Sequence, residues 1–234
     1  MPQKNFTVSG LGPVLVVKRR GSKNIRLTIT STQQVKVTVP SYVPYAVGVS
    51  FAVKKTEWIN KHLALRPKSV PVNGSRIGKS NRLIIVNISS QASLSTSVKH
   101  GEITVKIPAG TSQIVADEKI RKACERALKL EAEYLLPMRV EDFASKHNFS
   151  YQDVRIKKLK ARWGSCTSNK LISLSIYLMQ LPWHLIDYVI IHELVHTRHM
   201  HHQKNFWDEL ESILPSAKQF RKEIKNYDPV LMPE

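Results

Sequence analysis

Cysteine, long apolar runs and, in the first half of the chain, acidic residues are scarce in this sequence. The two cysteines, Cys124 and Cys166, lie in segments of different character, so neither a disulfide framework nor a cysteine-rich zinc site is expected. The longest apolar run near the histidine-rich segment, residues 185–191, is interrupted by Asp187 and is too short to span a bilayer. The N-terminus lacks the apolar core and cleavage site of a secretory signal. Together these absences predict a cytoplasmic protein with reduced thiols.

The shortage of acidic residues is confined to one half of the chain. Residues 1–115 contain 17 lysines and arginines against 2 acidic residues, whereas residues 116–234 contain 19 against 16. A positive field of this size attracts polyanions, so nucleic acid or an anionic substrate is a plausible partner. The alternative is a basic, well-solvated face without a specific partner. With 42% hydrophobic residues, the chain has enough apolar material for one large domain or two small ones.

Residues 1–112 are expected to form a basic, β-rich N-terminal region. Short segments of β-branched residues in rough alternation predict strands, separated by glycine and by Ser, Thr and Gln clusters. Residues 44–63 space their apolar side chains approximately as in a helix, and Pro67 and Pro71 close that segment. The predicted strands cover residues 13–20, 24–31, 34–40, 82–88, 93–98 and 102–108.

Residues 113–234 are expected to form a second domain that is richer in helix, which makes the whole chain an α+β protein. Residues 115–136 predict a long helix with Pro137 near its end, resumed over residues 138–147. Strands are expected within residues 154–165 and 171–179. A buried helix then begins at Pro182, and two shorter amphipathic pieces separated by Pro215 follow.

The buried helix carries an H-E-x-x-H motif formed by His192, Glu193 and His196. Positions four apart on a helix point in nearly the same direction, so two imidazoles reach one metal ion. Glu193 lies about 100° round the helix from His192, where it addresses a water on the metal as a general base. The alternative is a histidine-rich surface turn, but a carboxylate in so apolar a stretch needs a partner, and a dication is a natural one.

A catalytic zinc site usually takes a third protein ligand. His199 shares the helical face of His192 but lies about 10 Å further along a continuous helix, which is too far. The ligand should therefore come after a bend, and His202 is favoured, six residues beyond His196 in an HExxH-x5-H spacing. The competing candidates are the neighbouring histidine and three downstream glutamates: His201, Glu209, Glu211 and Glu223.

Four separate motifs resemble those of the YgjP-like metallopeptidase family, which is related to the SprT-like and WLM-type zincins. They are RWGSC at 162–166, ISLSIYLM at 172–179, LPWHLIDYVIIHELVH at 181–196, and a histidine six residues on, followed by FW at 206–207. VKVTVP, KKTEWINKHL and the long helix extend the resemblance over nearly the whole chain. The resemblance implies a zincin-like catalytic part behind a β-rich N-terminal part, with zinc as cofactor. His192, His196 and His202 fall on the ligand positions and Glu193 on the catalytic one.

The sequence departs from the family around the third ligand. The family commonly has Asn before and Ser after this histidine, whereas His201 and Gln203 flank His202 here, which removes short polar residues that would cap the next helix. Within RWGSC, Arg162 is a candidate for holding a substrate carboxylate or phosphate. Cys166, with an arginine nearby, has two interpretations, a reactive thiolate or part of a packed turn, and the second is favoured.

These observations favour a zinc-dependent peptidase in which a metal-activated water attacks the peptide bond and Glu193 is the general base. Tyr177, His184 and His199 are candidates for stabilising the developing oxyanion. The first alternative is a metal-dependent nucleotide phosphohydrolase of the pyrophosphatase type. The basic half of the chain favours this alternative, whereas the lack of a P-loop counts against it. A nucleic-acid-associated, SprT-like protease is the second. The expected partners are a protein or peptide substrate and, through the basic N-terminal half, nucleic acid or another polyanion, with no membrane.

Overall fold

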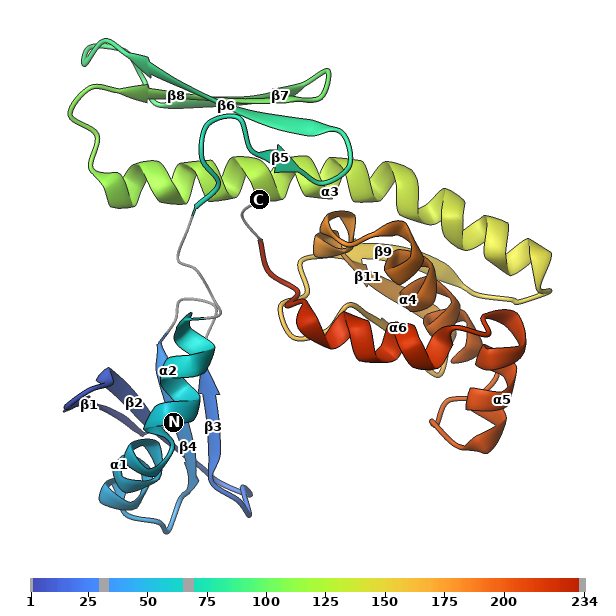
Figure 1. Ribbon diagram of the computed structural model, residues 1–234, viewed down its shortest axis with the longest axis horizontal. Coiled ribbons are helices and arrows are strands. Elements are labelled where there is room, and N and C mark those ends of the chain that lie inside the picture. Colours follow the sequence, from blue (N-terminus) through green and yellow to red (C-terminus); the bar gives the residue numbers. More distant parts are fainter. Residues whose placement is uncertain (1, 30–33, 65–69, 232–234) are drawn as a thin grey trace. The chain divides into compact units, whose positions relative to one another are not determined.

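The computed structural model describes residues 2–29, 34–64 and 70–231, and divides the chain into two compact units, Met1–Ser69 and Val70–Glu234 (Figure 1). Each unit has its own hydrophobic core. Both units contain helices and strands, and the strands form three separate sheets. The expectation of a mixed α and β protein is therefore confirmed. None of the helices in the described ranges is both long and apolar enough to cross a membrane.

The first unit is a four-stranded sheet with two helices packed on one face (Figure 1). The strand order is β1-β2-β4-β3, with β2 and β4 parallel and the other two pairs antiparallel. Every second residue of β4 is a buried valine, and these valines pack with Ala52 and Ile59 of the helices. The elements are β1 (Gln3–Val8), β2 (Gly12–Arg19), β3 (Arg26–Ile29), β4 (Val35–Pro40), α1 (Tyr45–Lys54) and α2 (Thr56–Ala64).

Most of this unit follows the periodicity of its sequence. The three predicted strands are present as β2, β3 and β4, but β1 was not anticipated. The single helix expected over residues 44–63 is divided in two at Lys55, whose φ of −110° and ψ of 17° leave the helical region. The last two residues of the predicted strand 24–31, and Pro67, lie outside the described residues.

The second unit begins with a sheet that packs against one long helix, α3 (Figure 1). The sheet order is β5-β6-β8-β7, and its buried residues Leu83, Ile103 and Val105 share a core with Leu128 and Leu136 of α3. The boundary expected between residues 112 and 113 falls inside this unit, because the helix that begins there covers the sheet before it. The elements are β5 (Arg76–Ile77), β6 (Asn81–Ile88), β7 (Ser95–Lys99), β8 (Glu102–Pro108) and α3 (Gln113–Lys146).

Helix α3 runs through Pro137 without ending. Proline inside a helix removes one hydrogen bond and crowds the preceding turn. Leu136 and Val140 on either side of it are both fully buried, as is Leu128 two turns earlier. Burial of this apolar stripe against the rest of the unit explains why one helix of 34 residues forms where two were expected.

A small three-stranded sheet and the helix α4 complete the core of the second unit. The sheet order is β10-β11-β9, so β10 is an edge strand, and β10 and β11 both pack against α4. The remaining elements are β9 (Asp153–Lys157), β10 (Gly164–Cys166), β11 (Leu171–Ser175), the 3-10 helix η1 (Ile176–Gln180), α4 (Trp183–Val195), α5 (Lys204–Ile213), α6 (Ala217–Glu223) and the 3-10 helix η2 (Ile224–Asn226).

Candidate metal centre

Three imidazoles converge at the C-terminal end of α4. His192 is in its last turn, His196 is the C-cap residue, and His202 follows a bend that leads to α5. One ring nitrogen from each lies within 4.8 Å of the other two, and Nε2 of His192 is 3.0 Å from Nε2 of His202. Two tetrahedral ligands held about 2.05 Å from a zinc ion lie roughly 3.3 Å apart. Among the described residues this is the one cluster of three such groups, and its spacing fits a divalent metal.

The environment keeps all three imidazoles in the form that binds metals. Burial is the main cause that lowers the pKa of each, and it lowers the pKa of His192 to about 3. The histidines are therefore neutral at pH 7, with a ring lone pair free to coordinate. Nδ1 of His196 lies 3.0 Å from the carbonyl oxygen of His199. Because a carbonyl only accepts, Nδ1 carries the proton and Nε2 is left as the ligand atom.

Glu193 follows the first histidine and is almost completely buried, with 5% of its surface exposed. Within the described part of the chain, its Oε2 has no hydrogen-bond partner. Burial raises the pKa of this carboxyl to about 8, and the positive charge of Arg162 opposes part of the rise. On β10, a Cβ added to Gly164 would lie 2.7 Å from Oε1 of Glu193. The carboxylate therefore occupies the space that a side chain at residue 164 would fill.

Helix α5 forms a wall of the histidine cluster. The indole Nε1 of Trp207 donates a 3.1 Å hydrogen bond to the carbonyl oxygen of His202, and the two rings stack with centroids 5.5 Å apart. The ring of Phe206, which is fully buried, lies 4.6 to 4.9 Å from all three imidazoles. Gln203, the N-cap residue of α5, makes no side-chain cap. The absence of a cap agrees with the missing short polar residue, and Trp207 holds this junction instead.

Arg198 ties the bend between α4 and α5 to α5 itself and to the end of α3. Its guanidinium pairs with Glu209 of α5 and donates to the carbonyl oxygens of His147 and Asn148, at the end of α3, over 3.1 and 2.6 Å. Glu209 also lies 2.8 Å from Nε2 of His199. These contacts hold the segment that leads to His202. The contact with Glu209 keeps the ring of His199 outside the histidine cluster.

Residues 23–227 match the family model described as YgjP-like, metallopeptidase domain. The chain belongs to the YgjP-like metallopeptidase family. The resemblance noted in the sequence is thereby confirmed. Among solved structures, the chain is similar to the metallopeptidase zymogen abylysin of Pyrococcus abyssi, with 25% identity and a TM-score of 0.36 over 38% of this chain and 91% of that one. No curated protein gives a significant match.

In this YgjP-like protein the other residues considered for the site have partners elsewhere. The three glutamates weighed as third ligands each lie beside a basic side chain, and His201 is not part of the cluster. The candidates for oxyanion stabilisation are likewise held by carboxylates. The pairs are Glu209 with Arg198 and His199, Glu211 with Lys218, Glu223 with His184, and Glu125 with Tyr177.

The RWGSC segment of the YgjP-like chain contributes differently from what its residue types suggest. Arg162 is exposed, and its charge acts on Glu193. Burial and the charge of Glu193 raise the pKa of Cys166 to about 11, so this thiol is protonated at neutral pH and is a poor nucleophile. The sequence placed Gly164 in a packed turn but did not predict its contact with Glu193, for which the one available signal was a glycine inside a strand.

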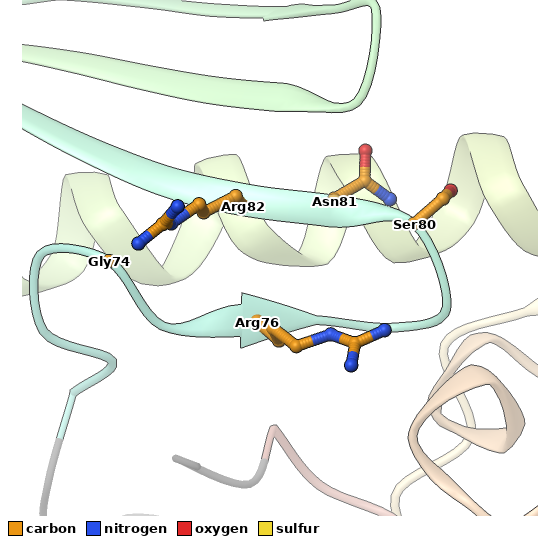
Figure 2. A pocket seen from close by; sticks show the side chains of 5 residues that line it. All are labelled: Gly74, Arg76, Ser80, Asn81 and Arg82. Atoms are coloured by element: carbon orange, nitrogen blue, oxygen red, sulfur yellow. The ribbon is translucent and has the colours of Figure 1, made fainter.

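A separate hollow of about 370 Å³ lies on the β5–β6 hairpin, away from the histidines (Figure 2). Arg76 and Arg82 are opposite each other in the antiparallel register, and their side chains run in opposite directions along the hairpin. Neither forms an ion pair with a described acidic residue. The lining is completed by Gly74, Ser80 and Asn81.

Proposed function

We propose that this YgjP-like chain is a zinc-dependent peptidase in which Glu193 is the general base. The observation that carries the proposal is a buried carboxylate, without a partner among the described residues, one residue after the first of three converging imidazoles. A carboxylate this deeply buried is costly unless a cation or a polar substrate group meets it. A metal ion held by the three imidazoles would offset the free-energy cost of burying this carboxylate.

His192, His196 and His202 are the ligands in this proposal. Three neutral imidazoles would hold a zinc ion and leave it accessible to a water molecule, as catalytic zinc sites require. When bound, the zinc ion polarises the scissile carbonyl and makes a water molecule easier to deprotonate. Two hydrogen bonds outside the cluster help to position the imidazoles, one at the ring Nδ1 of His196 and one at the backbone carbonyl of His202.

Glu193 moves the proton. Its Oε2 accepts the proton from the attacking water and returns it to the leaving amine. Burial makes this carboxylate a stronger base than an exposed glutamate, and a pKa close to the working pH suits a group that takes up and releases a proton in turn. The exposed Arg162 is placed to attract an anionic group of the substrate.

The edge strand β10 supports a peptide substrate. Trp163 and Thr167, on either side of it, make backbone hydrogen bonds to Ser175 and Leu171. In an antiparallel ladder, alternate residues bond to the same neighbour, so the backbone groups of Gly164 and Cys166 point away from β11. An extended peptide that pairs with them lies beside Glu193, which touches Gly164.

Hydrolysis of a phosphoanhydride is the second candidate, and the charges around the cluster favour it. Arg162 acts on Glu193, while Arg221 lies 4.3 Å over the ring of Trp207 and lowers the pKa of His202. Neither arginine pairs with an acidic residue in the ranges that the structure describes. Parallel assays with a peptide library and with nucleoside triphosphates separate the two activities.

The first experiment measures the metal content of the purified chain by elemental mass spectrometry. We expect about one zinc per chain in the wild type, in Glu193→Gln and in the control His184→Ala, whose ring pairs with Glu223 outside the cluster. We expect none in His196→Ala and His202→Ala. Hydrolysis should be absent in Glu193→Gln despite its full metal content.

Three results would contradict the proposal. Wild-type protein that stays metal-free after incubation with zinc would remove the metal centre. A Glu193→Gln variant with full turnover would leave the metal but remove the general base. Full metal content with hydrolysis of nucleotides and not of peptides would transfer the assignment to the second candidate.

A further inference from the structure

The first unit is far more basic than the second. Met1–Ser69 contains 12 lysines and arginines and a single acidic residue, Glu57. Val70–Glu234 contains 24 lysines and arginines against 17 acidic residues. So uneven a charge in a small folded unit costs stability through self-repulsion, and a polyanionic partner offsets that cost. The question is which surface of the first unit such a partner contacts.

The pairing register separates the two faces of the β1–β4 sheet. Residues opposite each other on neighbouring strands point to the same face. Val14, Val35 and Ile29 form one such row, and all three are buried with α1 and α2. The rows between the buried ones therefore form the other face, on which neither of the two helices described in the first unit lies.

This second face, here called the open face, carries three cations. Lys36 shares its row with Asn5 and Thr28, and Arg26 shares the next row with Gln3 and Thr38. Arg19 begins the row after that, opposite Pro40. Rows on one face are about 6.7 Å apart and strands about 4.8 Å apart, so the three Cα atoms lie roughly 8 to 14 Å from one another. Long flexible side chains at these separations can reach several phosphates of one backbone.

The three cations of the open face are not neutralised by the protein. Glu57, the single acidic residue of the unit, lies on α2, which packs against the opposite face. In the described part of the chain, the side chains of Arg19, Arg26 and Lys36 form neither ion pairs nor hydrogen bonds, and Arg19 and Arg26 are exposed. Lys18, in contrast, belongs to the covered face, where it donates to the carbonyl of Ser41.

We propose that the open face of the β1–β4 sheet binds the phosphate backbone of nucleic acid without sequence preference. Its uncharged polar side chains are amides and hydroxyls, which also contact phosphate and sugar. It carries no aromatic ring for stacking on unpaired bases, so backbone contact is the mode that it supports. Binding to an anionic membrane usually combines positive charge with inserted apolar side chains, but Leu15 is half-buried here and Val17 is buried.

The proposal is independent of metal chemistry, and its test uses the full-length chain without an activity assay. Fluorescence anisotropy measures binding to a labelled 20-base-pair duplex over a series of salt concentrations. With three phosphate contacts, log K should fall with log salt with a slope of about −3. The triple variant Arg19→Gln, Arg26→Gln, Lys36→Gln should weaken binding at least tenfold at low salt and flatten the slope. Each single variant should reduce the slope by about 1.

Two control variants separate the effect of this face from that of the total charge, and the first of them removes the same number of charges. Lys4→Gln, Lys54→Gln, Lys55→Gln removes three charges from the same unit on the side of the helices, and Arg76→Gln, Arg82→Gln removes the two arginines of the hollow in Figure 2. The affinity of both control variants for the duplex should stay within about twofold to threefold of the wild-type value, once the loss due to the lower net charge is taken into account. Circular dichroism confirms that each variant is folded.

The proposal is wrong if the open-face variant binds as tightly as wild type, or if the helix-side control loses as much affinity as the open-face variant does. It is also wrong if the chain does not bind the duplex at 50 mM salt but binds vesicles containing phosphatidylserine. That result would make a lipid surface the partner. Loss of binding only in Arg76→Gln, Arg82→Gln would move the interface to the β5–β6 hairpin. None of these results affects the assignment of the histidine cluster.

Discussion

The carboxylate of Glu193 rests against the bare Cα of Gly164. A Cβ at residue 164 would lie 2.7 Å from Oε1 and 2.8 Å from Cγ of the glutamate, closer than side-chain atoms pack. Residue 164 is on the edge strand β10 and residue 193 on helix α4, and the two elements pack directly on each other. The approach of strand and helix therefore depends on glycine, and so does the position of the proposed base.

Gly164→Ala should displace Glu193 without disturbing the histidines. We expect one metal per chain, as in wild type, and a loss of hydrolysis of about a hundredfold, because a shift of roughly 1 Å in a catalytic group costs that much. Metal content and turnover measured on the same preparation check this. Ser165→Ala, one residue along β10, is the control and should keep its activity. Unchanged turnover in Gly164→Ala would mean that the carboxylate has room to move without consequence.

Trp207→Phe should weaken the metal centre through the third ligand. Phenylalanine keeps a ring beside His202 but cannot donate to its carbonyl oxygen, which Nε1 of Trp207 does over 3.1 Å. Loss of such an orienting contact typically costs about 10-fold to 100-fold in metal affinity. Competition with a chromophoric zinc chelator measures the dissociation constant. Trp183→Phe, whose ring lies beside Lys79 and Arg139 at the start of α4, should bind zinc as wild type does, and equal affinities in all three proteins would refute the role.

Gly78→Ala should destabilise the second unit. Glu131 of α3 accepts hydrogen bonds from the backbone N–H of Lys79 and of Ser80, each 2.8 Å long. Gly78 has a φ of +72°, and a methyl group there would overlap Oε2 of Glu131. Backbone strain and a displaced buried carboxylate together should lower the free energy of unfolding by about 3 kcal/mol.

Urea denaturation of the full chain measures this loss, and Gly110→Ala separates its two causes. Gly110 has a φ of +85° with open space around its Cα, so alanine there should add backbone strain alone, about 1 kcal/mol. If both variants lose the same stability, the contact between the turn and Glu131 contributes nothing.

Cys166 should react slowly with iodoacetamide at neutral pH. Burial raises the pKa of its thiol to about 11, and only the thiolate is alkylated, so roughly one thiol in a thousand is reactive at pH 8. The rate should rise about tenfold per pH unit up to pH 10. Cys124, which is fully buried and has a pKa raised to about 12, is an internal control that should stay unmodified in the native chain. Rapid alkylation of Cys166 at pH 7, read by peptide mass spectrometry, would restore the reactive-thiolate interpretation.

The histidine cluster could be predicted from the sequence because its three histidines lie close together along the chain. The four-residue spacing of His192 and His196 is a property of any helix, and the rise per residue places His199 too far along it. The third ligand was therefore expected after a bend, and in the structure His202 lies beside the other two imidazoles. Even the missing cap at Gln203 could be foreseen, since its side chain is not one of the usual N-cap types.

The surroundings of the cluster could not be foreseen in the same way. No local pattern shows that Glu209 meets Arg198, or that Arg198 reaches the carbonyl of Asn148, fifty residues away. The boundary between the units was expected at a change of composition, near residue 112. The structure divides the chain at residue 69, because the β5–β8 sheet buries its apolar face on α3.

Three features follow from the amino-acid pattern alone, because each is local or additive along the chain: the periodic elements, the H-E-x-x-H helix and the concentration of positive charge in the first residues. Three other relationships become visible only in the folded chain: Glu193 rests on Gly164, Trp207 holds His202, and Arg19, Arg26 and Lys36 share one open face of a sheet. Such relationships depend on strand register and on packing between distant segments, where many weak contacts act together and no single residue type indicates the outcome.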